Sequence, residues 1–365
     1  MEGSDFKPGL EGVVAFETEI AEPDKEGNAL RYRGVDIEEL VGHVPYEKVW
    51  GLLVDDSFDP GMPRAENVDL PAKTASAMAD LQSATAALAG QWGLKQLIDM
   101  TDTEARDDLA RLSATMISIV AQSARGPDRV DDEIVSRGDT AAERFLLRWR
   151  GEADPHHVRA IDSYWVSAAE HGANASTFTG RIVASTGADC AAAMSAAVGA
   201  LSGPLHGGAP SRVLQMLDEV EQTGDAERWV KDALDRGDRL MGFGHRVYRA
   251  EDPRARVLRR TAREIGAPRL EIAEKLEDAA LAELKARKPD RVLATNVEFW
   301  SAVVLDFADV PPELFTPMFA SARVGGWAAH IMEQKREGRL IRPTARYVGP
   351  EPRPADSVNG AGPAS

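Results

Sequence analysis

Residues 312–338 read PELFTPMFASARVGGWAAHIMEQKREG, and this stretch indicates the fold class most clearly. Between Phe315 and Ala329 the only charged side chain is Arg323, and the other side chains are mostly small or apolar. A run of this kind, ended by a glycine, is typical of a long helix. We therefore predict a helix from Pro312 to Gly338 that carries one guanidinium among apolar neighbours.

Segments with helical spacing cover most of the remaining chain. We place them at 37–52, 72–98, 103–124, 139–150, 157–170, 189–201, 210–224, 226–236, 252–266, 270–287 and 297–306. The clearest β signal comes earlier, where Val13–Ile20 and Ala29–Arg33 flank the turn-rich AEPDKEGN and predict a hairpin. The expected fold is mainly α, with a small β-hairpin near the N-terminus and a small β element near each end. Residues 125–133 are expected to form an exposed connection, and the proline-rich residues 350–365 a loose C-terminal tail.

Composition excludes several classes of protein. The 365 residues include 43 Lys and Arg against 59 Asp and Glu, a net charge of −16, which argues against nucleic acid and anionic membrane as partners. The single cysteine, Cys190, excludes a disulfide framework within the chain and a cysteine-rich metal site. No secretory signal or transmembrane stretch is evident, so we expect a cytoplasmic protein, most simply an enzyme.

Two histidines lie among glycines rather than on an apolar face. His206 lies in GPLHGGAP, and His245 lies in GFGHRVY about forty residues later. Taken alone, each is compatible with an ordinary turn histidine. Flanking glycines also let a ligand approach the backbone closely, so the pair is a candidate for a functional site.

Two arginines and one glutamate point to anion chemistry. Arg254 falls in the first turn of a helix that begins at Asp252-Pro253, where acidic side chains are normally preferred. It is either solvated or grips an anion together with the helix N-terminus. A buried Arg323 needs an anionic partner, either a structural carboxylate or a bound substrate. Glu298, in TNVEFWSAVV, is either an ordinary first-turn acid or a general base beside aromatic side chains.

Taken together, several segments resemble citrate synthase. The matching stretches, in the order of that family, are LEGVVAFETEI, LRYRGVDIEEL, EHGANASTFTGRIVAS, GPLHGGAP, GFGHRVYRAEDPRA, NVEFWSAVVL and LFTPMFASARVGGWAAHIMEQKREGRLIRP. They extend over residues 9–350, which is nearly the whole chain. The resemblance implies a two-domain helical fold, with a large domain of residues 1–207 and 309–349 and a small inserted domain of residues 208–308 that closes over the substrates.

The resemblance also implies a reaction and assigns residues to it. Acetyl-CoA would condense with oxaloacetate, and the citryl thioester would then be hydrolysed, at the entry to the tricarboxylic acid cycle. In that reaction His206 stabilises the enol, His245 protonates the oxaloacetate carbonyl and Glu298 removes the methyl proton. The residues implied to hold the oxaloacetate carboxylates are His171, Arg254, Arg323 and Arg342, the last lent across a homodimer interface. Arg249, Gly242 and Gly244 are implied to contact CoA, and no metal or cofactor is expected.

The chain departs from the family at the base, because Glu298 stands where most members carry an aspartate. We expect the pocket to have adjusted to the longer side chain, although a less efficient base or a different acyl-CoA fits the sequence as well. The alternatives are a 2-methylcitrate synthase that uses propionyl-CoA and a homologue that has lost the reaction. A metal-dependent hydrolase lacks the necessary ligand spacing.

Overall fold

The computed structural model describes residues 6–24, 26–27, 29–66, 68, 74–126, 128, 130–207, 210–244, 248, 250–291 and 293–358. Within these residues the fold is mainly helical, as predicted, with one small antiparallel sheet near the N-terminus. The longer helices are α2 (Tyr46–Asp55), α3 (Ala77–Trp92), α4 (Asp102–Arg125), α6 (Ala141–Arg150), α7 (Pro155–Ala168), α8 (Ala175–Ser185), α9 (Cys190–Leu201), α10 (Pro210–Thr223), α11 (Ala226–Asp235), α12 (Pro253–Glu264), α13 (Leu270–Arg287), α14 (Val297–Phe307) and α15 (Phe315–Glu337). Shorter elements are α1 (Ile37–Leu40), α5 (Asp132–Ser136), η1 (Pro8–Leu10), η2 (Leu97–Asp99), η3 (Pro312–Leu314) and η4 (Ala355–Ser357).

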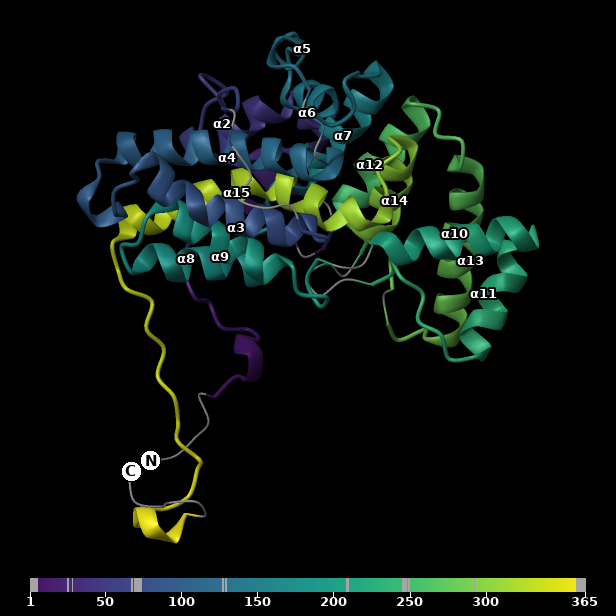
Figure 1. Ribbon diagram of the computed structural model, residues 1–365. Coiled ribbons are helices and arrows are strands. Elements are labelled where there is room, and N and C mark those ends of the chain that lie inside the picture. The colour runs from purple at the N-terminus through teal and green to yellow at the C-terminus, as the bar shows by residue number, and fades with distance from the viewer. Residues whose placement is uncertain are drawn as a thin grey trace.

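Helix α15 is the central element of the larger group of helices. It contacts α2, α4, α7, α8 and α9, and most of its residues are buried over its whole length. Figure 1 shows it running through this group, while α10, α11 and α13 lie together on one side with α12 and α14 between them and the rest. Helices α12 and α14 both pack against α7, so side chains at their first turns lie next to the larger group.

The hairpin is shorter than predicted. Its strands are β1 (Ala21–Pro23), β2 (Leu30–Tyr32) and β3 (Val35–Asp36), in the order β1-β2-β3. The expectation that Val13–Ile20 forms a strand is wrong. Pairing begins at Ala21 opposite Tyr32, and the next residue of the partner strand, Arg33, turns away with a positive φ of 48°. Ile20 still accepts a hydrogen bond from the Arg33 N–H at 2.9 Å, but the chain before Ile20 has no strand to pair with and bonds instead to α15, through the Glu333 carboxylate.

Four other expectations need correction. The helix predicted at 37–52 is divided into α1 and α2, because Pro45 lacks an N–H and restricts the residue before it. Helix α8 was not predicted, although Asn174 caps it by accepting a hydrogen bond from the Thr177 N–H at 3.0 Å. The connection at 125–133 includes the start of α5. Residues 338–358 contain no strand, so the β element expected near the C-terminal end is not found in that segment.

The segment after α15 leaves the helical body. Residues 342–355 are all exposed, and Figure 1 shows this segment extending away from the helices. No helix in the described part of the chain has both the length and the apolar composition needed to cross a membrane.

Candidate active site

Arg254 is fixed by a carboxylate two residues before it. Asp252 caps α12 by accepting the Arg254 N–H at 3.0 Å, and the same carboxylate accepts hydrogen bonds from Arg254 Nε at 3.0 Å and Nη2 at 2.8 Å. Both side chains are buried. Burial lowers the pKa of Arg254, but Asp252 more than offsets this and raises it, so the guanidinium is charged. The first-turn position of Arg254 was predicted, whereas its pairing with Asp252 was missed.

Asp252 also connects two helices. Its Oδ2 accepts the N–H of Val297 at 3.1 Å, and Val297 is the first residue of α14. The spacing Asp-Pro-Arg at a helix start could have revealed the contact with Arg254, because the capping side chain faces the same turn. Nothing in the sequence indicated the contact with Val297, which lies 45 residues away in the chain.

Glu298 lies in the first turn of α14, as predicted, and Asn296 is the capping residue. The Glu298 N–H donates to Asn296 Oδ1 at 3.0 Å. Burial raises the pKa of Glu298, and the positive charge of Arg254 offsets part of that shift. A half-buried carboxylate with a raised pKa at a helix start has the properties required of a general base.

The loop that contains Gly242 and Gly244 is hydrogen-bonded to the chain just before Glu298. Asn296 N donates to Gly242 O at 2.9 Å, Asn296 Nδ2 donates to Gly244 O at 2.9 Å, and Phe243 pairs with Thr295 in an antiparallel bridge. Gly242 has a φ of +86°, and a Cβ there would lie 2.8 Å from the Cβ of Phe299. Only glycine fits both the conformation and the close approach. His245 and Arg249, which follow in the sequence, lie outside the described residues.

His206 is a neutral imidazole whose proton can be assigned. It lies in the turn after α9, and its Nε2 is 3.3 Å from the backbone N–H of Ser176 and 2.9 Å from the Ser176 hydroxyl. A backbone N–H can only donate, so Nε2 accepts and the ring proton is on Nδ1. Burial, together with the charge of Arg323, lowers the pKa of His206 to about 4. His206 is therefore a neutral hydrogen-bond donor through Nδ1 at ordinary pH.

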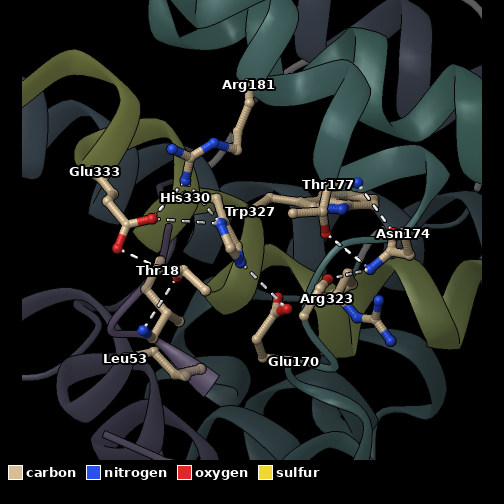
Figure 2. Close-up of polar contacts among 12 residues, drawn as sticks. Thr18, Leu53, Glu170, Asn174, Thr177, Arg181, Arg323, Trp327, His330 and Glu333 are labelled. Carbon is tan, nitrogen blue, oxygen red and sulfur yellow. Dashed lines mark hydrogen bonds and ion pairs between the residues drawn. The ribbon is translucent and has the colours of Figure 1, made fainter. Parts of the chain in front are cut away.

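Arg323 is a buried residue of α15 whose side chain is held at Nε and over an aromatic ring. Its Nε donates to the Ala168 carbonyl at 2.9 Å, and its guanidinium carbon lies 4.7 Å from the centre of the Phe319 ring. Neither Nη1 nor Nη2 makes a hydrogen bond with the described residues, and Figure 2 shows the guanidinium pointing away from Glu170. Unpaired guanidinium donors in a buried position fit a carboxylate ligand.

His171 lies close to Arg323 in the chain fold, just after the Ala168 carbonyl. Its Nε2 is 2.8 Å from the Tyr248 hydroxyl, and the two rings pack edge to face. Burial raises the pKa of Tyr248, so the phenol stays protonated. This contact joins the larger group of helices to the loop that precedes α12.

The structure brings four of the predicted residues within electrostatic range of one another. Arg323 affects the pKa of His206, Arg254 affects the pKa of Arg323, and Arg254 also affects the pKa of Glu298. Arg342 is not among them, because it is exposed on the segment that leaves the helical body. The described residues contain no cluster of His, Cys, Asp and Glu that could hold a metal ion.

Two buried arginines, a neutral histidine donor and a half-buried carboxylate on a helical scaffold are the features of an enzyme that acts on carboxylate-bearing molecules. The citrate synthase C-terminal domain family matches residues 9–344 of the chain. The chain therefore belongs to the citrate synthase family, as its sequence motifs predicted.

Similar proteins include both citrate synthases and a related enzyme. A Mycobacterium tuberculosis protein named "Putative citrate synthase 2" is 61% identical over 358 residues, which is 97% of this chain and 96% of that protein. A 2-methylcitrate synthase of Shewanella oneidensis is 31% identical over 371 residues, covering 94% of this chain and 95% of its own. The solved structure of citrate synthase from Thermoplasma acidophilum, in a ternary complex with carboxymethyl coenzyme A and oxaloacetate, has a TM-score of 0.81 and 28% identity over 96% of this chain and 98% of that chain.

Proposed function

We propose that the protein is a citrate synthase, which condenses acetyl-CoA with oxaloacetate and hydrolyses the resulting thioester to citrate and CoA. The observation that carries the proposal is the state of His206, whose neutral ring has a proton on Nδ1 and lies near Arg323. The methyl group of acetyl-CoA is a very weak carbon acid, so its deprotonation needs a donor on the thioester oxygen. A neutral imidazole can donate that hydrogen bond, and it has no extra acidic proton to give to the general base.

In this proposal the residues divide the chemistry between them. Glu298 takes a proton from the methyl carbon while His206 Nδ1–H donates to the thioester oxygen, which gives an enol. The enol carbon attacks the ketone carbon of oxaloacetate, and His245 protonates the ketone oxygen. Water then cleaves the thioester and releases CoA, and no cofactor or metal is required.

Oxaloacetate is a dianion, and the two guanidinium groups of the site differ in whether a carboxylate of the protein already pairs with them. Arg323 has terminal nitrogens without partners among the described residues, so it is the principal carboxylate ligand. Arg254 is held rigidly by Asp252 and adds orientation more than net charge. His171 completes the set from this chain, and Gly242, Gly244 and Arg249 would contact CoA.

The exposed position of Arg342 supports the expected homodimer. A residue on a segment that leaves its own helical body is placed to reach a second subunit. We propose that Arg342 enters the partner's site, that residues 208–308 close as a small domain over the bound substrates, and that residues 350–365 form a loose tail. The protein would act in the cytoplasm.

A 2-methylcitrate synthase is the second candidate, because one relative carries that name and Glu298 changes the length of the base. The test is release of free thiol from acetyl-CoA and from propionyl-CoA, each with and without oxaloacetate. Oxaloacetate-dependent release that is much faster with acetyl-CoA is expected. A preference for propionyl-CoA would favour the second candidate, and no release from either would refute both.

A further inference from the structure

A network of buried polar side chains lies beside Arg323, on the side away from its terminal nitrogens (Figure 2). It consists of Glu170, Arg181, His330 and Glu333, and we call it the Glu170 network. The first three side chains are almost completely buried, at 0%, 0% and 1% exposure. Figure 2 shows Glu170 between His330 and Arg323, with Arg181 and Glu333 on the far side of the His330 ring. Charged groups buried to this extent must be oriented by one another.

The contact with Arg181 shows which ring nitrogen of His330 carries the proton. Its Nη1 lies 3.1 Å from His330 Nδ1, and a guanidinium can only donate, so Nδ1 is an acceptor. The ring proton is therefore on Nε2, which lies 3.3 Å from Glu170 Oε1. Arg181 is in turn fixed by Glu333 Oε2 at 2.5 Å and by Gln334 Oε1 at 3.0 Å. Arg181 therefore donates to His330, and the His330 Nε2–H faces the Glu170 carboxylate in a close electrostatic contact that is not an aligned hydrogen bond.

Glu170 is close to Arg323 without pairing with it directly. Burial raises the pKa of Glu170, while the contact with His330 and the charge of Arg323 act in the opposite direction. Yet Arg323 Nε donates to the Ala168 carbonyl, and no hydrogen bond joins the two side chains. Helix α15 packs against the carboxylate at Gly326, where a Cβ would lie 2.0 Å from Glu170 Oε2.

This arrangement leaves a choice open to the Glu170 carboxylate. It can stay beside the His330 Nε2–H, or, once that contact is lost, it can turn toward the neighbouring guanidinium and pair with its charge. In the second position it would compete with a substrate carboxylate for the Arg323 guanidinium.

We propose that His330 is a positioning residue for oxaloacetate binding, which holds the Glu170 carboxylate away from Arg323 and so keeps the terminal nitrogens of Arg323 open to the substrate. The inference rests on the function proposed above, in which Arg323 binds an oxaloacetate carboxylate. His330 touches neither substrate nor reacting atoms, and it acts only through Glu170 and Arg323.

The test compares two uncharged replacements of His330. His330→Gln keeps one donor and one acceptor, whereas His330→Phe keeps the ring shape and removes both. For His330→Phe we expect KM for oxaloacetate to rise at least about tenfold, since the cost of displacing a buried carboxylate from Arg323 is added to binding. KM for acetyl-CoA should change by less than about twofold, and His330→Gln should stay within about threefold of wild type for both substrates.

The double variant separates positioning from packing. In Glu170→Gln/His330→Phe no carboxylate remains to occupy Arg323, so KM for oxaloacetate should return to within about threefold of wild type. Equal KM values for His330→Phe and His330→Gln, or a double variant weaker than His330→Phe alone, would overturn the proposal.

A measurement on the wild type covers the case in which His330→Phe does not fold. Nitrogen-15 chemical shifts of the His330 ring, assigned by comparison with His330→Gln, should show a proton on Nε2 and none on Nδ1. A doubly protonated ring or a proton on Nδ1 would contradict the inference. Absence of oxaloacetate-dependent turnover in the wild type would instead refute the proposed function, so the two failures are distinguishable.

Discussion

Replacing Asp252 by Asn tests the part of the site that holds Arg254 and Glu298 together. The Asp252 carboxylate accepts four hydrogen bonds, from the Arg254 N–H, Nε and Nη2 and from the Val297 N–H, at 2.8–3.1 Å. Asparagine has nearly the same shape but no charge, and one of its two terminal atoms is a donor. Asp252→Asn therefore turns an amide NH₂ toward donors and removes the negative charge that faces Arg254.

The magnitude follows from burial. Asp252 is 0% exposed and the Arg254 side chain 4% exposed, so water cannot replace the lost contacts. Removing one partner of a buried ion pair costs about 3–5 kcal/mol, and this range already includes the donors left without acceptors. We expect Asp252→Asn to lower the free energy of unfolding by that amount. KM for oxaloacetate should also rise, because Arg254 loses its fixed orientation.

The assay is urea unfolding of wild type and variant followed by circular dichroism, with steady-state kinetics on the same preparations. Asp238→Asn is the matched control, since Asp238 pairs with Arg236 on the surface, where the two side chains are 53% and 57% exposed. Asp238→Asn should lower the free energy of unfolding by less than about 1 kcal/mol. If Asp252→Asn cost no more than the control, the claim that this carboxylate organises the site would be refuted.

Three further predictions follow from the same geometry. Glu298→Gln should lower kcat by about 10²–10⁴-fold and Glu298→Asp by about a hundredfold or less, and near-normal turnover of Glu298→Gln would exclude Glu298 as the base. In the wild type, activity should fall as pH falls, and because burial raises the pKa of Glu298, the acidic limb of the kcat/KM profile should lie above the ordinary glutamate pKa. The His206 ring should stay neutral from pH 8 to 5 because its pKa is about 4, and an NMR titration with a midpoint near the ordinary value of about 6.5 would contradict this. Gly326→Ala should lower the free energy of unfolding by at least about 1–3 kcal/mol, because the new Cβ would lie 2.0 Å from Glu170 Oε2. In the control Gly90→Ala the new Cβ meets nothing within 4 Å, so thermal unfolding should show a neutral or stabilising effect.

Helices and their first residues were the most predictable features of the fold. Asp189, Asp252 and Asn296 cap three of the helices expected from the sequence, at 189–201, 252–266 and 297–306, and such a capping side chain acts on the backbone within three residues. The prediction of a strand at Val13–Ile20 was wrong because a strand depends on residues outside its own segment. A strand needs a partner, and the sequence of one segment does not show where its partner turns away.

The candidate site was predictable as a set of residue types but not as a set of contacts. Arg323 stood out because it is the only charge in an apolar stretch, and it is buried as expected. Its neighbour Glu170 was missed, since a single glutamate before His171 carries no local signal. The role of Ser176 beside His206 was also missed, because the two are 30 residues apart and meet only where α8 begins beside the turn after α9.

The central claim is tested most directly by following the methyl carbon of acetyl-CoA into the product. Wild-type protein is incubated with oxaloacetate and acetyl-CoA labelled with carbon-13 in the methyl group, and the products are identified by mass spectrometry while free CoA is counted in the same sample. The proposed function predicts one labelled citrate for each CoA released, and neither product without oxaloacetate. Release of CoA with the label in acetate, or no release at all, would contradict it.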